Sequence, residues 1–153
     1  MGRVDQISVS EGGVPKLAVE SAVIDDSGVV GDAQADRVHH GHAEQALCLF
    51  SLEVIEGMQA EGHPIEPGSA GENITVSGMD WGLVVPGTRM IIGDVEIEIT
   101  GYTTPCAKNA RWFTDGNYNR MHVKKNPGES RVYARVLHGG IVTTGAAIEL
   151  VTQ

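Results

Sequence analysis

The amino-acid sequence predicts a mostly β domain, a largely antiparallel barrel with a few short helices. The chain of 153 residues contains 20 glycines, and Val, Ile and Thr are prevalent, which favours short strands joined by tight turns. Residues 89–100 carry the pattern of a β-hairpin. No internal repeat, low-complexity tract or linker divides the sequence, so residues 1–153 are predicted to form a single domain.

The composition is that of a globular protein. Hydrophobic residues make up 41% and charged residues 20%, and a chain of this length can bury one substantial core. No apolar run approaches the roughly 20 residues that cross a bilayer, and no secretory signal is visible, so we expect a cytoplasmic protein without a membrane partner. The net charge of −9 argues against nucleic acid as a partner, because phosphate contacts need a basic face.

The first half of the chain predicts strands followed by one helix. Val4–Val9 and Leu17–Ile24 have the residue types of strands, with turn residues between them. Ala46–Phe50 is a continuous apolar run with the length of a short buried strand. Ser51 is a suitable N-cap for a helix over Leu52–Ala60, and a glycine and a proline shortly afterwards end that helix.

The second half predicts the hairpin and two later strands. In residues 89–100, two β-rich arms flank Gly93 and Asp94, a two-residue connection with glycine first, as a type II′ turn prefers. The second arm alternates apolar and acidic residues, so one of its faces is expected to be buried. Arg131–Leu137 and Ala147–Val151 supply two further strands, and helical turns are expected between the hairpin and the first of them.

Charge is unevenly distributed along the chain. Residues 101–140 hold seven basic residues against two acidic ones, a net charge of +5, which leaves −14 for the rest of the sequence. One interpretation is an exposed basic helix face. The other is a basic patch on an acidic protein, suited to a small anionic ligand or cofactor.

Two cysteines do not form a disulfide framework in a domain of this size, so each is interpreted separately. Cys106 follows Pro105, whose ring stiffens the chain at a strand exit, and precedes Lys108 and Arg111. Nearby cations and a helix N-terminus favour the thiolate, which attacks electrophiles or binds metal, whereas most free cysteines are simply small buried residues. Cys48 lies between two leucines with no cation near it in sequence, and we predict that it belongs to the core.

Three histidines, His39, His40 and His42, stand within four residues. Such a loop could seed a zinc site, but no further ligands follow at a familiar spacing. Hydrogen-bond donors and proton carriers beside a ligand are the better interpretation. Packing against nearby acidic side chains is the structural alternative.

Residues 68–76 place a glycine-rich loop before a strand. Glycines such as Gly71 let the backbone approach a ligand closely, and Glu72 and Asn73 offer orienting hydrogen bonds. No Gly-Lys-Ser/Thr follows, so the loop is not a phosphate-binding P-loop. A turn in which Asn73 caps the backbone is equally compatible with the sequence.

Taken in order, these segments resemble the MOSC domain, named for the C-terminal part of molybdenum-cofactor sulfurases. Each motif is weak alone, but together they follow the family's order from about residue 29 to residue 150. The matching residues are Gly31-Asp32, His39-His40-Gly41, Gln45-Ala46-Leu47, Gly71-Glu72-Asn73 with Thr75, Pro86-Gly87, Ile92-Gly93-Asp94, Pro105-Cys106, Arg131-Val132-Tyr133-Ala134-Arg135-Val136, Gly139-Gly140 and Gly145. The family commonly has a second glycine where His42 stands.

The resemblance implies a β-barrel of the MOSC, pyruvate-kinase-barrel-like kind and assigns Cys106 to the family cysteine. In members of the mitochondrial amidoxime-reducing kind, that cysteine ligates the molybdenum of a pyranopterin dithiolene, and the enzyme reduces N-hydroxylated compounds. In the sulfurase context the cysteine is instead proposed to carry persulfide sulfur. A soft thiolate suits both tasks. Larger reductases also contain an N-terminal barrel for which this chain has no room, so a homodimer or another protein is expected to complete the pocket.

The leading hypothesis is therefore a molybdenum-cofactor (molybdopterin) protein that reduces a small-molecule substrate, with Cys106 as metal ligand. His39 or His40 would relay protons, and an electron-transfer protein would be a partner. The expected cofactor-binding residues are Gly71, Glu72, Asn73, Lys108, Arg111 and Arg131, with Lys108 and Arg111 at the cofactor phosphate.

Three alternatives remain open at this point. The second hypothesis is a metal-free persulfide carrier or C–S bond-cleaving enzyme that uses Cys106 and a sulfur-donor protein. The third is a non-enzymatic module that delivers the cofactor to a partner. The last is a zinc hydrolase built on His39, His40 and His42.

Overall fold

A computed structural model describes residues 2–10, 14–32 and 43–151 of the chain. The strands are β1 (Gly2–Val9), β2 (Leu17–Val19), β3 (Ser21–Asp25), β4 (Gly28–Val29), β5 (Leu47–Ser51), β6 (Ile74–Ser77), β7 (Arg89–Ile92), β8 (Val95–Tyr102), β9 (Val132–His138), β10 (Gly140–Thr143) and β11 (Ala147–Val151). The helices are α2 (Leu52–Ala60) and the short 3-10 helices η1 (Ala43–Gln45), η2 (Trp81–Leu83), η3 (Ala107–Trp112) and η4 (Tyr118–Met121).

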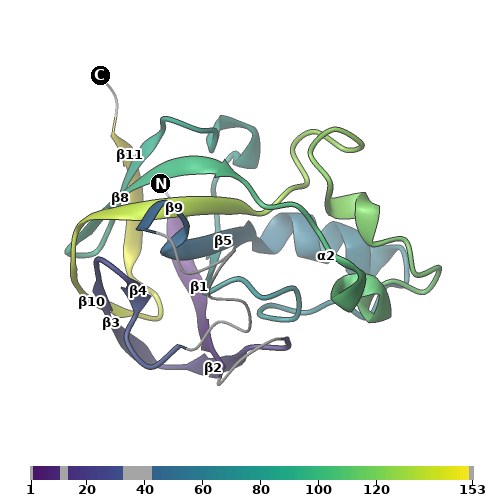
Figure 1. Ribbon diagram of the computed structural model, residues 1–153, viewed down its shortest axis with the longest axis horizontal. Helices are drawn as coiled ribbons and strands as arrows, with labels where there is room; N and C mark the ends of the chain where they lie inside the picture. Colours follow the sequence, from purple (N-terminus) through teal and green to yellow (C-terminus); the bar gives the residue numbers. More distant parts are fainter. Residues whose placement is uncertain (1, 11–13, 33–42, 152–153) are drawn as a thin grey trace.

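Seven of these strands close into a barrel (Figure 1). Hydrogen bonds connect them in the order β11, β7, β8, β9, β5, β6 and β1. The ring is completed where Gly2 and Arg3 of β1 pair with Ile148 and Ala147 of β11. Neighbouring strands are antiparallel except β5 and β6, which are parallel and are connected through α2. The prediction of a mostly antiparallel β-barrel with few helices is therefore confirmed.

A small second sheet, in the order β10, β3, β4, lies beside the barrel at the lower left of Figure 1. Ile24 of β3 and Val142 of β10 point inward, are each 1% exposed, and join the same apolar core as the barrel strands. Val23 and Ile141, which pair across these two strands, point outward and are 49% and 61% exposed. The small sheet thus covers part of the barrel with one face only.

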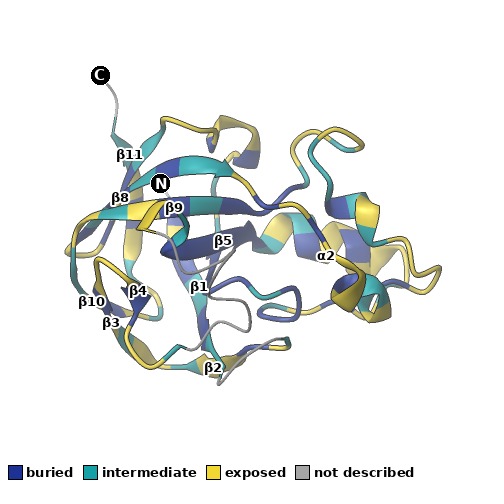
Figure 2. Ribbon diagram, in the orientation of Figure 1, coloured by how far each residue is buried: buried dark blue, intermediate teal, exposed yellow. Residues whose placement is uncertain are grey.

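The barrel core follows the alternation seen in the sequence. Val95, Ile97 and Ile99 of β8 are at most 1% exposed, while Glu96 and Glu98 between them are only partly buried. Figure 2 shows this change of burial from residue to residue along the long strands. At the turn before β8, Gly93 has a φ of 59°, a left-handed value that favours glycine. The predicted hairpin is confirmed.

The helix over Leu52–Ala60 is confirmed with both predicted ends. The Ser51 hydroxyl accepts a hydrogen bond from the Val54 amide at 3.2 Å, which satisfies one of the free N–H groups of the first turn. Ile55 and Met58 are fully buried and fix the face that packs on the barrel.

The segment that connects β8 to β9 lies with α2 at the right of Figure 1. Arg120 ties the two together, because its guanidinium donates to Glu61 just after the helix at 2.7 Å and to Glu129 before β9 at 2.8 Å. These charge-assisted bonds raise the pKa of Arg120 and lower that of Glu61.

One strand prediction is wrong in its continuity. Residues 17–24 do not form a single strand but break at Glu20 into β2, which pairs with β1, and β3, which pairs with β10. The Glu20 carbonyl accepts a hydrogen bond from Thr144 at the point where the chain passes from the barrel to the small sheet. Apolar patterning could not reveal this change of partner. Within the described residues, no helix is long and apolar enough to cross a membrane.

Candidate functional site

Cys106 lies where β8 has ended and η3 begins. Its backbone is extended (φ −125°, ψ 170°), its carbonyl accepts a hydrogen bond from Asn109 at 2.9 Å, and its side chain makes no capping hydrogen bond. Cys106 is exposed, whereas Cys48 is 7% exposed. The predicted helical turn after Cys106 is present as a short 3-10 helix, and of the two thiols this one is open to a ligand.

Cys48 is buried as predicted, but its surroundings are not purely apolar. Its Sγ lies 3.6 Å from the Thr103 hydroxyl, and it pairs across the sheet with Tyr133. Burial raises the pKa of the Cys48 thiol and, together with the Cys48 and Cys106 charges, raises the pKa of Tyr133 to about 12. Both cysteines therefore lie close enough to the Tyr133 hydroxyl to influence its pKa.

Arg131 is a buried cation at this site, with 5% of its surface exposed. Its Nη1 donates to the Ala70 carbonyl at 2.7 Å, whereas its Nε has no hydrogen-bond partner among the described residues. The Arg131 charge opposes the effect of burial on both Cys48 and Glu72. The guanidinium thus connects the glycine-rich loop with the start of β9.

Glu72 is fully buried beneath that loop. One carboxylate oxygen accepts hydrogen bonds from the Gly68 amide at 3.0 Å and from the Thr75 hydroxyl at 3.1 Å, while the other has no partner among the described residues. Burial raises the pKa of Glu72. Gly71 beside it has a φ of 102°, and a Cβ there would lie 3.1 Å from Val14. The buried Glu72 side chain therefore stabilises the loop through these hydrogen bonds.

Asn73 links the loop to an ion pair that sequence reasoning missed. Its Oδ1 accepts from the Cys48 amide at 2.9 Å, and its Nδ2 donates to the Asp32 carboxylate at 2.6 Å. The same carboxylate forms a salt bridge with Lys16, which is 8% exposed. Asp32 was among the residues of the resemblance, but Lys16 follows a turn in an ordinary sequence context that gave no sign of burial.

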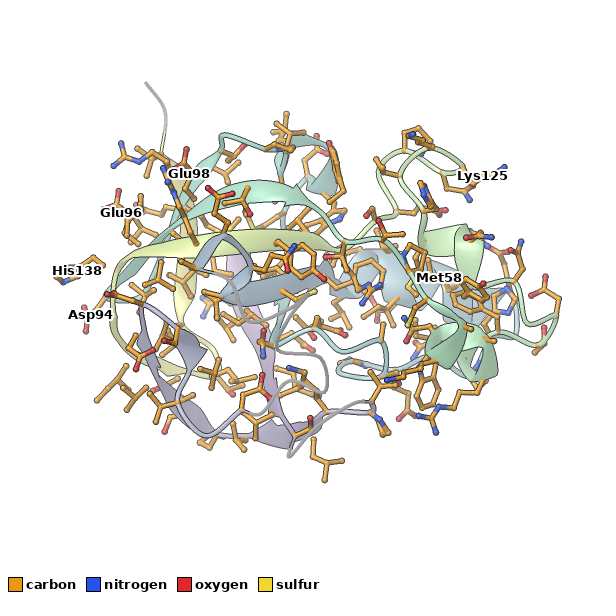
Figure 3. All side chains as sticks on the ribbon, viewed as in Figure 1. Met58, Asp94, Glu96, Glu98, Lys125 and His138 are labelled. Carbon is orange, nitrogen blue, oxygen red and sulfur yellow. The ribbon has the colours of Figure 1, made fainter. Side chains whose placement is uncertain are left out.

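The basic segment does not act as one patch. Arg120 and Arg135 are paired with glutamates and Arg131 is buried, while Lys108, Lys124 and Lys125 are exposed. Figure 3 shows Lys125 at the right end of the molecule and Asp94, Glu96, Glu98 and His138 at the left. Because Arg135 pairs with Glu98 and Arg120 pairs with Glu61 and Glu129, basic and acidic side chains lie together and the basic segment does not form a continuous patch.

Arg111 contacts Trp112, one of the residues that line a pocket next to η3. Its Nη2 donates to the Val14 carbonyl at 2.7 Å, and its guanidinium lies 4.8 Å from the centre of the Trp112 ring. A partly open pocket of about 400 Å³ lies between this ring and β2. The Trp112 Nε1 is buried without a hydrogen-bond partner among the described residues. The lining residues are Gln6, Pro15, Lys16, Leu17, Ala18, Gln59, Glu66, Pro67, Ser69 and Trp112.

His39, His40 and His42 lie outside the described residues, so their predicted roles stay predictions. In the part of the chain that the structure describes, no group of three His, Cys, Asp or Glu side chains could hold a metal ion.

Comparisons with known proteins agree with this barrel. The family model described as the MOSC domain matches residues 36–149. The uncharacterized protein YflK of Bacillus subtilis (strain 168) is 30% identical over 146 residues, which are 94% of this chain and 65% of YflK. The chain therefore spans somewhat less than two thirds of the length of this curated relative.

Solved structures share the fold at low sequence identity. The structure of YiiM from Geobacillus stearothermophilus superposes with a TM-score of 0.77 at 21% identity, covering 99% of this chain and 76% of YiiM. The structure of YuaD from Bacillus subtilis gives a TM-score of 0.72 at 19% identity and covers 98% of this chain and 96% of YuaD.

Proposed function

The chain belongs to the MOSC domain family, which is associated with molybdenum-cofactor binding or sulfur-related function, and from this premise we propose that it binds the molybdenum cofactor through Cys106. In this proposal the protein is a reductase of small N-hydroxylated or related molecules. The observation that carries it is the exposed Cys106 thiol, whose carbonyl is hydrogen-bonded to the amide of Asn109, a buried residue with a side-chain oxygen that has no partner among the described residues.

Several buried polar groups of the described residues lack hydrogen-bond partners and suit a ligand rich in donors and acceptors. Buried polar atoms in folded proteins are nearly always hydrogen-bonded. Here Arg131 Nε, Glu72 Oε1, Asn109 Oδ1 and Trp112 Nε1 have no partner among the described residues. A phosphorylated pterin offers amide and amine donors, ring and phosphate acceptors, and a negative charge for the arginines. The residues present therefore fit the group that the family implies.

Each residue has a distinct task in this proposal. The Cys106 thiolate is the protein ligand of the metal, and a soft sulfur ligand suits molybdenum. Arg131 and Asn109 supply a donor and an acceptor beside it, and Lys108 and Arg111 attract the phosphate. When bound, the cofactor supplies the two electrons that the reduction of an N–O bond requires. His39 and His40 are kept as candidate proton carriers.

The loop formed by Gly71, Glu72 and Asn73 acts mainly as a scaffold in this proposal. Glu72 and Asn73 are 0% and 1% exposed, and both side chains form hydrogen bonds with other protein atoms. They hold the backbone of the loop where it meets Arg131 through the Ala70 carbonyl. A rigid supporting layer of this kind keeps ligand-binding groups in place.

The test is the molybdenum content of protein produced in a host that makes the cofactor. Wild-type protein should contain molybdenum and pterin, and C106S should contain neither. Folded wild-type protein without molybdenum, with cofactor available, would contradict the proposal. Equal cofactor binding by C106A and wild type would instead indicate a delivery module in which the thiol is not a ligand.

A metal-free sulfur carrier is the second candidate. It is favoured by the exposure of Cys106, whose side chain makes no capping hydrogen bond with the described residues. Mass spectrometry of protein from its own host would then show one added sulfur atom on the Cys106 peptide, removable by thiols. The same peptide without that mass would argue against this candidate.

A further inference from the structure

Thr103, which lies three residues before Cys106, makes four polar contacts with other residues. Its amide donates to the Arg131 carbonyl at 3.0 Å, and its own carbonyl accepts from the Ser130 hydroxyl at 3.5 Å. Its hydroxyl lies 3.6 Å from Cys48 Sγ and also hydrogen-bonds to the Tyr133 side chain. Thr103 is 4% exposed, so these contacts are made away from water.

Two residues, Thr104 and Pro105, connect Thr103 to Cys106, so the contacts of Thr103 restrict where the Cys106 thiol lies. Thr104 is exposed, whereas Pro105 is buried and its ring fixes the backbone angle that precedes Cys106. The Cys106 side chain has no capping hydrogen bond of its own. Its position therefore depends on where the chain is fixed upstream and on the single carbonyl contact with Asn109.

We propose that Thr103 is a positioning residue, which holds the Cys106 thiol in place through the hydroxyl contacts with Cys48 and Tyr133. This inference rests on the proposed role of Cys106 as the ligand-binding thiol. In this proposal the buried Cys48 does more than fill the core, because its Sγ is one of the two contacts that fix the Thr103 hydroxyl. The strand register supports this geometry, since Tyr133 lies opposite both Cys48 on β5 and Gly101 on β8.

The test compares T103V, T103S and T104V in cofactor-free protein. Valine keeps the shape of threonine and removes the hydroxyl, serine restores the hydroxyl, and T104V makes the same chemical change at the exposed neighbour. The readout is the rate at which iodoacetamide labels Cys106, followed by peptide mass spectrometry so that Cys48 is measured separately. We expect T103V to change the labelling rate of Cys106 about fivefold in either direction, because the thiol is already exposed and a lost buried hydrogen bond alters its position by a free energy of about 1 kcal/mol. T103S and T104V should label at the wild-type rate.

Two results would overturn the inference. One is a T103V labelling rate equal to that of wild type, and the other is an equal change in T104V. If T103V does not fold, Y133F removes one of the two hydroxyl contacts and should change the labelling rate of Cys106 by a similar factor, with Y102F as the matched control. An unchanged rate in folded Y133F would then contradict the proposal.

A second readout separates this inference from the proposed function. In a cofactor-producing host, T103V should lose molybdenum on dialysis several-fold faster than wild type and T104V. Wild-type protein without molybdenum would refute the proposed function but leave the labelling experiment decisive for Thr103. Unchanged labelling in T103V would refute the role of Thr103 even if wild type held the cofactor.

Discussion

Lys16 and Asp32 form an ion pair whose side chains are 7% and 4% exposed. The Asp32 carboxylate also accepts hydrogen bonds from the Ser10 amide at 2.9 Å and from Asn73 at 2.6 Å. A charge in such a place is tolerated only with its partner, because desolvation of either ion alone is costly. The pair therefore joins the N-terminal strands to the loop beneath the candidate site.

The first prediction follows from removing one charge of this pair. D32N should lower the free energy of unfolding by about 3 kcal/mol, because it leaves the Lys16 ammonium buried without its counterion. Urea unfolding of D32N measures this loss. The double variant K16M/D32N should recover more than half of it, since no unpaired charge is left. A D32N variant as stable as wild type would contradict the prediction.

Glu72 makes the pH dependence of stability predictable in sign. Its pKa in the folded protein is raised above the ordinary value of 4.5, so the folded state favours the protonated carboxyl. The stability that this group contributes is complete below its unfolded pKa and is lost as pH rises through its folded pKa. E72Q cannot ionise, so its stability relative to wild type should increase as pH rises above about 4.5. Urea unfolding at a series of pH values measures this difference, and a constant difference would refute it.

Arg120 should contribute more to the free energy of unfolding than a residue in an ordinary surface ion pair does. It bonds two carboxylates, Glu61 and Glu129, whereas Arg135 bonds one carboxylate, Glu98, among the residues that the structure describes. R120M should cost about 1 kcal/mol of unfolding free energy, at the upper end for partly exposed pairs. The control R135M should cost about half as much or less, and the gap should shrink in high salt. Thermal unfolding at low and high salt would show this, and equal costs would contradict it.

Two glycines with left-handed backbones should respond differently to alanine. Gly28 has a φ of 112°, and a Cβ there would lie 2.1 Å from the Ala46 carbonyl oxygen. Gly31 has a φ of 92°, with no atom within 4 Å of the same position. G31A should therefore cost about 1 kcal/mol for the backbone alone, and G28A at least about 3 kcal/mol because β4 and residue 46 must move apart. Similar losses in both variants would show that the close approach at Gly28 is readily relieved.

Local patterns in the sequence were sufficient to predict several of the helices and strands. The helix between Leu52 and Ala60, the hairpin at Gly93 and the strand Ala147–Val151 are decided by capping, turn chemistry and alternation within a few residues. The break at Glu20 and strand β10 were missed because they depend on the pairing of β3 with the distant β10, whereas β4 has only two residues, too few to show a pattern.

The candidate site shows the same division. The exposure of Cys106 and the burial of Cys48 followed from a proline–cysteine step and an apolar run. The contacts among Lys16, Asp32 and Asn73 join segments far apart in the chain, and no local pattern indicates them. For Thr103 the sequence showed only that it precedes Cys106, because the residues that its side chain contacts lie on β5 and β9.

The pairing of Gly2 with Ile148 that completes the barrel has a consequence for folding. During synthesis, β1 leaves the ribosome with β2 and later β6 as available partners, while β11 is made after all the other described strands. The ring can close only when contacts about as distant as the chain allows are formed, and such contacts slow folding. Until then the open edges of β1 and β7 are sites for wrong pairing. Efficient production of this protein therefore depends on how fast β11 adds to the barrel once it is made.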